Sequence, residues 1–471
     1  MTFTEGYKQL NTAQKQAVDT IDGPVLVVAG PGTGKTQLLA LRAANILQQT
    51  DVAPQNILCL TYTEVGARNM RERLTKLIGQ AAYDIRISTY HGFGSDIIRT
   101  YSEYFNEFGA EQAVDALGQD AILQSIFATL PASNPLWRAE VYLKDTISLI
   151  SEFKRALLSP QDVRDIANSN QMFIASASEI VLATIPEFAR INKDVVGHFA
   201  ALLAPFQKLA STSLLASNIQ PLANVCITDL AEALGAFDET GKTNTITSWK
   251  NKWLVKNIDN KWVLGGTREV KKLLGAADIY EQYLQALKDK KLFDYDDMIT
   301  RAIHGLEQND DLRFTLHEQY QYVMLDEFQD TNLAQLRLVE LLTNNPVLQG
   351  HANVLAVGDD DQAIYSFQGA ELTNMVRFTH MYKDVQVITL TENYRSHTDI
   401  LESAHAIASQ IEERLGDVLG GNKEQLLAKN PNIKDARIIR TQLKSDIAQY
   451  DWVSSEIDTL IKKGTAPEEI A

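Results

Sequence analysis

Cysteine is nearly missing from this chain of 471 residues. The two that occur, Cys59 and Cys226, lie far apart in the sequence, and Cys59 stands inside an apolar, strand-like run. Such a pair excludes a disulfide framework, and it is too small for a cysteine-based zinc site. Both cysteines are therefore expected to be reduced residues of the hydrophobic core.

Long apolar runs are missing too. Val25–Ala29, the longest one near the start of the chain, is far too short to cross a bilayer, which takes about 20 residues. The opening residues MTFTEGYKQLN have neither the basic start nor the apolar centre of a secretory signal. We therefore expect a cytoplasmic protein without a membrane partner.

A surplus of basic residues is also absent: Lys and Arg number 44 against 60 for Asp and Glu, and the net charge is −16 at pH 7. This balance argues against a protein that coats nucleic acid nonspecifically, but it allows a local basic track on an acidic body. The apolar share of 45% is that of an ordinary globular protein, and the length allows several domains.

Short β-rich runs alternate with helical patterns in two parts of the chain. The runs are Val25–Ala29, Ile57–Thr61, Ile85–Thr89, Tyr322–Asp326, Val354–Gly358 and Val385–Leu390. Buried runs that alternate with helices predict an α/β fold with a doubly wound parallel sheet. Between residues 101 and 290 helical periodicity dominates, as in AILQSIFATL and DTISLISEFKRALL, which predicts a mainly helical domain inserted into the α/β domain.

A third region follows residue 390. It contains the helical TDILESAHAIASQIEERL, the strand-like ARIIRTQL and the helical DWVSSEIDTLIKKG. The predicted domains are therefore 1–100 and 291–390 for the two parts of one α/β domain, 101–290 for the helical insertion, and 391–471 for the incomplete start of a second α/β domain.

The first motif with a chemical meaning is VLVVAGPGTGKT, residues 25–36. A buried strand enters a glycine-rich loop, whose backbone N–H groups can surround phosphate oxygens. Lys35 would reach the β- and γ-phosphates, and the Thr36 hydroxyl would hold Mg²⁺. The loop itself consists of Ala29, Gly30, Pro31, Gly32, Thr33 and Gly34, with Ala29 where such loops usually have their first glycine. The motif predicts an ATP site.

The second motif is YVMLDEFQDTN, residues 322–332. An apolar strand delivers Asp326 and Glu327 at its C-terminal end, the edge at which open α/β sheets bind ligands. Asp326 is placed to hold Mg²⁺ through water, and Glu327 to orient the water that attacks the γ-phosphate. With a phosphate loop upstream, the pair indicates ATP hydrolysis.

These motifs stand in the order of a known family. In sequence they are LNTAQKQAV (10–18), AGPGTGKT (29–36), TYTEVGARNMRERL (61–74), STYHGFG (88–94), FDYDDMI (293–299), LDEFQDTN (325–332), VGDDDQAIYSFQGA (357–370) and LTENYRS (390–396). The chain resembles superfamily 1 DNA helicases of the UvrD/Rep/PcrA type, and SEFKRALLSPQDV (151–163) resembles part of their helical insertion.

The resemblance implies RecA-like motor domains of the P-loop NTPase class that couple ATP hydrolysis to 3′–5′ movement on single-stranded DNA and to duplex unwinding. The implied partners are single-stranded DNA and junctions of single- and double-stranded DNA. Gln14 would contact adenine, Arg42 would support the base region and Tyr394 would stack on the base. Arg395 would act as an arginine finger, a role that suits its permanently charged planar group.

Gln329 and Gln362 would contact the attacking water or the γ-phosphate, again by resemblance. The neighbouring aspartates of GDDDQAIYSFQG (358–369) suggest a metal site by themselves, but the Mg²⁺ ligands are better assigned to Thr36 and Asp326. The aspartates are therefore expected to shape a loop.

Seven residues match family positions along the single-stranded DNA track: Thr61, Tyr62, Thr63, Tyr90, His91, Tyr365 and Phe367. Hydroxyl groups would hold phosphates and rings would stack on bases, without sequence preference. The chain departs from the family at Glu64–Val65, where Asn-Lys is common, and at Phe367–Gln368, where Trp-Arg is common. These changes bear on the coupling between nucleotide state and DNA grip.

A basic segment, residues 242–272, has two possible interpretations. It holds seven Lys and one Arg against Asp259 and Glu269, a local charge of +6, with three tryptophans interleaved. The segment could grip a nucleic-acid backbone, such as that of incoming duplex. Equally, it could be a small β-ribbon whose tryptophans pack inward while its lysines stay solvated.

The family's last motifs find no match before Ala471, so the chain is expected to be the N-terminal portion of a longer protein or a truncated product. Three activities follow as alternatives. The chain could be a helicase, a nucleotide- and DNA-binding module without unwinding activity, or the motor part of a helicase–nuclease.

Overall fold

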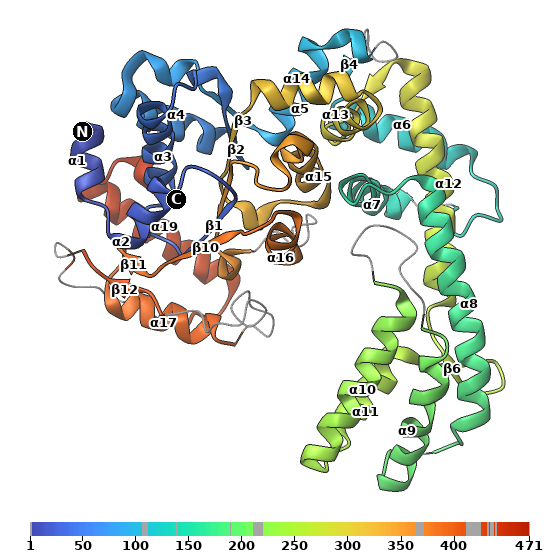
Figure 1. Cartoon of the computed structure of the whole chain (residues 1–471). Helices are drawn as coiled ribbons and strands as arrows, with labels where there is room; N and C mark the ends of the chain where they lie inside the picture. The colour runs from blue at the N-terminus through green and yellow to red at the C-terminus, as the bar shows by residue number, and fades with distance from the viewer. Residues whose placement is uncertain are drawn as a thin grey trace. The chain divides into compact units, whose positions relative to one another are not determined.

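The structure is a computed structural model (Figure 1). It describes residues 2–105, 112–137, 140–188, 190–210, 220–363, 372–410, 425–430, 433, 438 and 440–470. The chain divides into two compact units. The first contains Met1–Gly30 and Gly34–Leu390, and the second contains Pro31–Thr33, Thr391–Glu412 and Glu424–Ala471.

A six-stranded parallel sheet forms the centre of the first unit (Figure 1). Its strands, in spatial order, are β10 (Gln386–Leu390), β1 (Val25–Ala29), β9 (Val354–Gly358), β8 (Tyr322–Leu325), β2 (Ile57–Thr61) and β3 (Arg86–Thr89). All neighbours pair in parallel. The six predicted strands are therefore confirmed, and so is the parallel α/β sheet.

Helices cover both faces of this sheet, which explains why β1, β2 and β9 are buried along their whole length. Along β1, Leu26 and Val28 join one hydrophobic cluster, whereas Val25, Val27 and Ala29 join another. The second of these clusters includes α2 (Thr12–Asp19), α3 (Lys35–Gln49) and α4 (Glu64–Ile78). The first includes α5 (Tyr90–Thr100), α13 (Asp297–Gln308), α14 (Asp310–Gln319), α15 (Leu333–Thr343) and α16 (Leu372–Met381).

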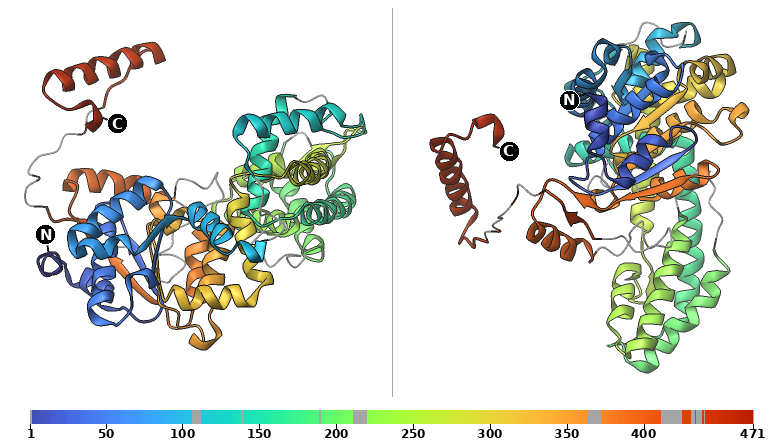
Figure 2. Two further views of the ribbon diagram at one scale, coloured as in Figure 1. Left: turned by 90° about the horizontal axis from the view of Figure 1, so that it is seen from above. Right: turned by 60° about the vertical axis from the view of Figure 1, so that its left-hand side comes forward.

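Helices dominate residues 101–290, as predicted. They are α6 (Ala116–Thr129), α7 (Leu143–Arg155), α8 (Pro160–Thr184), α9 (Lys193–Gln207), α10 (Leu222–Thr240), α11 (Asn244–Trp253) and α12 (Thr267–Lys290). They enclose two further hydrophobic cores, one around α8–α11 and one around α6, α7 and α12. Helix α8 contributes side chains to both cores, and Figure 2 shows it as one long helix in the green part of the chain. These helices belong to the same compact unit as the sheet, so the predicted division at residues 100, 290 and 390 stays a prediction.

The basic segment 242–272 contains the whole of α11, an antiparallel ribbon of β5 (Leu254–Lys256) and β6 (Trp262–Leu264), and the start of α12. Trp249 and Trp253 are buried, and each indole N–H donates a hydrogen bond toward α10. Lys250 and Lys256 lie over the ring of Trp262, which stacks on Phe188. A ribbon and inward tryptophans were both part of the second interpretation, but the two buried tryptophans lie on α11 and not on the ribbon.

Shorter elements complete the first unit: α1 (Phe3–Lys8), and a parallel pair of β4 (Gln112–Ala113) with β7 (Leu292–Phe293). The second unit contains β11 (Glu392–Asn393), β12 (Leu427–Ala428), α17 (Thr398–Ala408) and α19 (Asp446–Lys462). The two helices confirm the helical patterns there. The strand expected in ARIIRTQL is not seen at 438 or 440–443, its described residues. Among the residues that the structure describes, no helix is long and apolar enough to span a membrane.

Candidate functional site

The loop between β1 and α3 has the geometry of an anion cradle. Gly32 and Gly34 have φ angles of 71° and 89°, in the left-handed region that favours glycine. Helix α3 begins at Lys35, and within the described residues no side chain caps its first turn. The backbone N–H groups of that turn point along the positive end of the helix dipole, where a phosphate is stabilised. Thr36 is the second residue of the same turn.

The chain's second motif meets this cradle. The Lys35 ammonium donates a 2.7 Å hydrogen bond to the carboxylate of Glu327, which follows β8 two residues later. Glu327 has a left-handed backbone with φ of 47°, an uncommon conformation for a residue with a side chain. Its N–H donates to the Asp326 carboxylate at 3.0 Å. The sequence-predicted residues Lys35, Asp326 and Glu327 are thus brought together.

Burial makes two carboxyl groups of this site easier to protonate. Burial first, and then the nearby negative charge of Glu327, raise the pKa of Asp326 to about 6. The same two causes raise the pKa of Asp330 to about 6, and its Oδ1 has no hydrogen-bond partner within the described residues. Lys35 opposes both shifts. A cation near these carboxylates would stabilise their charged forms.

The donor set fits Mg²⁺. Asp326 offers a buried carboxylate and Thr36 a hydroxyl group, both hard oxygen ligands. No group of three or more His, Cys, Asp or Glu residues is arranged as a metal site in the described part of the chain.

A chain of hydrogen bonds leaves Glu327 for the next strand. The Gln329 amide donates to Glu327 at 2.8 Å and accepts from the backbone N–H of Asp359, just after β9, at 3.0 Å. The Gln362 amide donates to the Asp359 carboxylate at 2.5 Å. A Cβ on Gly358 would lie 2.7 Å from the Gln329 amide oxygen, so only glycine leaves room for this arrangement. The predicted pair Gln329 and Gln362 therefore lies on one polar chain.

The residues assigned to the adenine side occupy different environments. Gln14 accepts from the Asn11 N–H at the start of α2, and its amide nitrogen lies beside Gly34. Arg42 is only 1% exposed, and it donates to the backbone carbonyls of Ala17, Thr20 and Ile21 at the end of α2. Arg42 thus holds the helix that carries Gln14, rather than presenting its guanidinium to a ligand.

Tyr394 and Arg395 lie in the second unit, which also contains residues 31–33 of the loop. The Tyr394 N–H donates to the Gly32 carbonyl at 2.9 Å, and its ring is partly exposed. A Cβ on Gly32 would lie 2.6 Å from Cβ of Arg395. Glycine at position 32 therefore permits both its left-handed backbone and this close approach.

The residues expected along the DNA track are not all accessible. Thr63 is exposed and caps α4 through a 3.0 Å bond from the Gly66 N–H, and Tyr62 is half-buried. Thr61 is buried. Tyr90, the first residue of α5, is 1% exposed and its side chain belongs to the hydrophobic cluster on that side of the sheet. Its ring cannot stack on a base from this position. Its burial contradicts the expectation for Tyr90, which belongs to the core.

His91 forms an aromatic pair that sequence reasoning missed. Its ring stacks on Tyr295 at 3.9 Å between centroids and 21° between planes. Burial, and then the charge of Arg155, lower the pKa of His91 to about 4, so the ring is neutral at pH 7. Tyr295 is 55% exposed. The available signal was the aromatic residue between aspartates in FDYDDMI.

Two of the departures from the family pattern can be placed. Glu64 accepts a 2.9 Å hydrogen bond from the Thr89 hydroxyl, so it links α4 to the end of β3. Val65 is exposed on the first turn of α4. Tyr365, Phe367 and Gln368 lie outside the described residues.

Comparisons with known proteins agree with this geometry. The family model of the UvrD/REP helicase N-terminal domain matches residues 10–383. The chain is 26% identical over 450 residues to the ATP-dependent DNA helicase PcrA of Leuconostoc citreum, covering 95% of this chain and 44% of that protein. The PcrA proteins of Staphylococcus epidermidis and Staphylococcus aureus are 25% and 24% identical, over 86% of this chain and 41% and 40% of their own lengths. The chain thus spans less than half the length of these relatives.

Proposed function

The chain belongs to the UvrD/REP helicase family, and from that premise we propose that it is an ATP-dependent DNA motor. The motor would couple ATP hydrolysis to 3′–5′ movement on single-stranded DNA and to duplex unwinding. The observation that carries the proposal is the contact of Lys35, at the start of α3, with Glu327, at the end of β8. It joins a phosphate cradle to a carboxylate that can act on water.

ATP binding would rearrange this contact. The γ-phosphate would draw Lys35 away from Glu327, because the phosphate carries more negative charge than the carboxylate. Glu327 would then be free to orient the attacking water, and the Gln329 amide would respond, since it donates to the same carboxylate oxygen. Bound Mg²⁺, held by Thr36 and Asp326, would offset charge on the phosphates. Arg395 would stabilise the charge of the transferring group.

Gln329 connects the proposed nucleotide site to the segment that is proposed to bind DNA. Its carbonyl oxygen holds the N–H of Asp359, at the start of the segment that continues to Tyr365 and Phe367. We propose that these two rings, together with Thr63, His91 and Tyr295, contact single-stranded DNA by stacking and by hydrogen bonding to phosphates. The sites of action would be junctions of single- and double-stranded DNA in the cytoplasm.

Replacing Lys35 by alanine tests the nucleotide site. Lys35→Ala removes the ammonium group that would bind the phosphates, so ATPase activity stimulated by single-stranded DNA should fall to background. The rate is measured on the chain itself, with Lys8→Ala, an exposed lysine of α1, as the matched control. Stimulated turnover near that of the wild type would refute the assignment of the site.

A second candidate function is a nucleotide- and DNA-binding module without unwinding activity. It is favoured by one observation, the 44% share of the Leuconostoc citreum PcrA length that the chain covers. Strand-displacement assays on this chain, and on a version extended along the parent reading frame, separate the two candidates. Displacement by the extended chain alone would support the module, and displacement by both would support the motor.

A further inference from the structure

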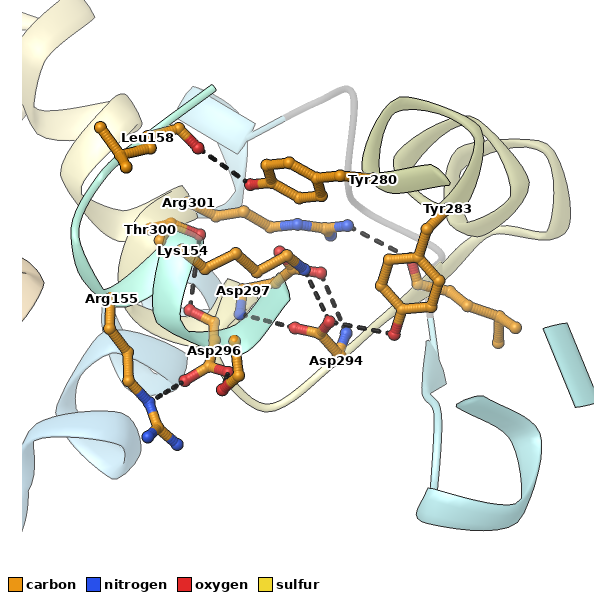
Figure 3. A network of polar contacts seen from close by, with 12 residues as sticks. Lys154, Arg155, Leu158, Tyr280, Tyr283, Asp294, Asp296, Asp297, Thr300 and Arg301 are labelled. Carbon is orange, nitrogen blue, oxygen red and sulfur yellow. Dashed lines mark hydrogen bonds and ion pairs between the residues drawn. The ribbon is translucent and has the colours of Figure 1, made fainter. Parts of the chain in front are cut away.

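One helix, α7, holds the three aspartates that flank Tyr295 in the sequence, Asp294, Asp296 and Asp297. Lys154 of α7 is 3% exposed, and its ammonium donates at 2.6 Å to both Asp294 and Asp297 (Figure 3). The Tyr283 hydroxyl of α12 donates to Asp294 at 3.1 Å. The two aspartates also bond to each other's backbone N–H groups, at 3.0 and 3.1 Å. This closes the turn that leads from β7 into α13.

Asp296, on the other side of Tyr295, is tied to the same helix. It accepts a hydrogen bond from the Ser151 hydroxyl. It also accepts one from the Arg155 Nε at 3.1 Å, which Figure 3 shows. Residues 151, 154 and 155 lie within one turn of α7, so they form one rigid set of donors. The backbone before and after Tyr295 is therefore fixed with respect to α7.

Tyr295 itself stacks on His91 of α5 and is 55% exposed. We infer that Lys154, together with Ser151 and Arg155, positions Tyr295 for stacking on a base of bound single-stranded DNA, so that α7 sets the strength of the DNA grip. This inference rests on the proposed DNA function and adds three positioning residues to it.

The burial of the charges makes the arrangement specific. An ammonium group and two carboxylates away from water are stable only with their partners in place, because an unpaired buried charge is strongly unfavourable. Burial also raises the pKa of Asp297, which Lys154 opposes. An arrangement of the turn that separates Lys154 from these aspartates would leave a buried charge unpaired, so the contacts with α7 favour the turn that carries Tyr295.

A double-mutant cycle tests the inference. The variants are Lys154→Met, Tyr295→Ala and the pair, and the measurement is the Kd for a fluorescent oligothymidine. Each single change should raise Kd about tenfold, the size of one lost base–aromatic stack. If Lys154 acts through Tyr295, the pair should also raise Kd about tenfold, because the second change removes nothing further. The KM for ATP without DNA should stay unchanged.

Arg164→Met is the matched control. Arg164 joins α8 to α12 through Asp278 and Glu281, in the same helical region, and the structure describes no contact of it with residues 294–297. Its effect on Kd should be small and independent of Tyr295. Should Lys154→Met fail to fold, a variant with both Ser151→Ala and Arg155→Met removes the two donors to Asp296, which are less buried than Lys154. Its combination with Tyr295→Ala tests whether α7 acts on DNA binding through Tyr295.

The binding measurements distinguish a failure of the positioning role of Lys154 from a failure of the proposed DNA binding. A Kd that rises about a hundredfold in the Lys154→Met, Tyr295→Ala pair would show independent effects and overturn the positioning role. Wild-type chain that fails to bind the oligonucleotide would instead overturn the proposed DNA function, and this inference with it.

Discussion

The carboxyl group of Asp326 lies where the fold disfavours its charge. Burial and the neighbouring Glu327 raise its pKa to about 6, whereas it ionises near pH 4 in an unfolded chain. The folded state therefore holds this proton more tightly than the unfolded state does. The stability that the group contributes is present below about pH 4 and is lost as the pH rises through about 6.

Replacing Asp326 by asparagine should consequently stabilise the protein while it abolishes the proposed ATP hydrolysis. Asp326→Asn keeps an oxygen for the Glu327 N–H but carries no charge. We expect a gain of about 2 kcal/mol in the free energy of unfolding at pH 7.5, shrinking toward zero near pH 4. Urea unfolding at several pH values measures it. A variant no more stable than the wild type at pH 7.5 would contradict the raised pKa.

For single residues, the motifs predicted which side chains meet in the site better than they predicted how deeply each side chain is buried. The meeting of Lys35 with Glu327 followed from two motifs at one sheet edge, because carboxyl ends of parallel strands lie together. Burial of Tyr90 and Arg42 did not follow, since adjacent motif residues can face the core or the solvent and only the packed helices decide which. Tyr295 was missed because its partner His91 comes from a helix that lies far away in the sequence.

Among the elements, strands were easier to predict than short ribbons. Strands buried on both faces appear as continuous apolar runs, so all six sheet strands were predicted to within one residue at each end. The β5–β6 ribbon has three residues per strand, too few for a pattern, and was foreseen only as an alternative for a basic segment. ARIIRTQL has the composition of a strand without the structure of one at its described residues.

The same substitution in two helices should have opposite effects. A Cβ on Gly94 of α5 would lie 2.4 Å from the Met298 carbonyl oxygen of α13, so Gly94→Ala must push the two helices apart. Gly235 of α10 has open space around its Cβ position. We expect Gly94→Ala to lower the free energy of unfolding by about 2 kcal/mol and Gly235→Ala to raise it by about 0.5–1 kcal/mol.

Chemical denaturation of both variants provides the comparison. Since the residue change is identical, the difference between the two reports helix packing and not helix propensity. Two variants with equal unfolding free energies would show that α5 and α13 are not in close contact.

For the molecule as a whole, a charge of −16 requires that the proposed DNA binding rest on local basic groups. Lys250 and Lys256 both lie over the ring of Trp262, while Lys252 is paired with Asp229. With Trp249 and Trp253 buried, the basic segment 242–272 can offer charge to a phosphate backbone but cannot offer those two rings to bases.

Reversing Lys250 and Lys256 to glutamate should therefore weaken binding to a duplex junction and make it less dependent on salt, by up to about two units in the slope of log K against log salt. Lys288 and Lys290, exposed at the end of α12, give a control pair with the same change in net charge. If the two pairs of substitutions weaken junction binding equally, the weaker binding comes from the change in net charge and not from the basic segment 242–272.

The strand order of the sheet also decides when it can form. Strand β1 lies between β9 and β10, and the Gly23 N–H beside it bonds to Asn353, 330 residues later. During synthesis, β1 must wait for almost the whole first unit to leave the ribosome before its partners exist. The cores around α6–α12 come from nearer stretches of sequence and can assemble in that interval. Until then β1 has two unpaired edges, and unpaired strand edges are the places where a nascent chain can form wrong contacts.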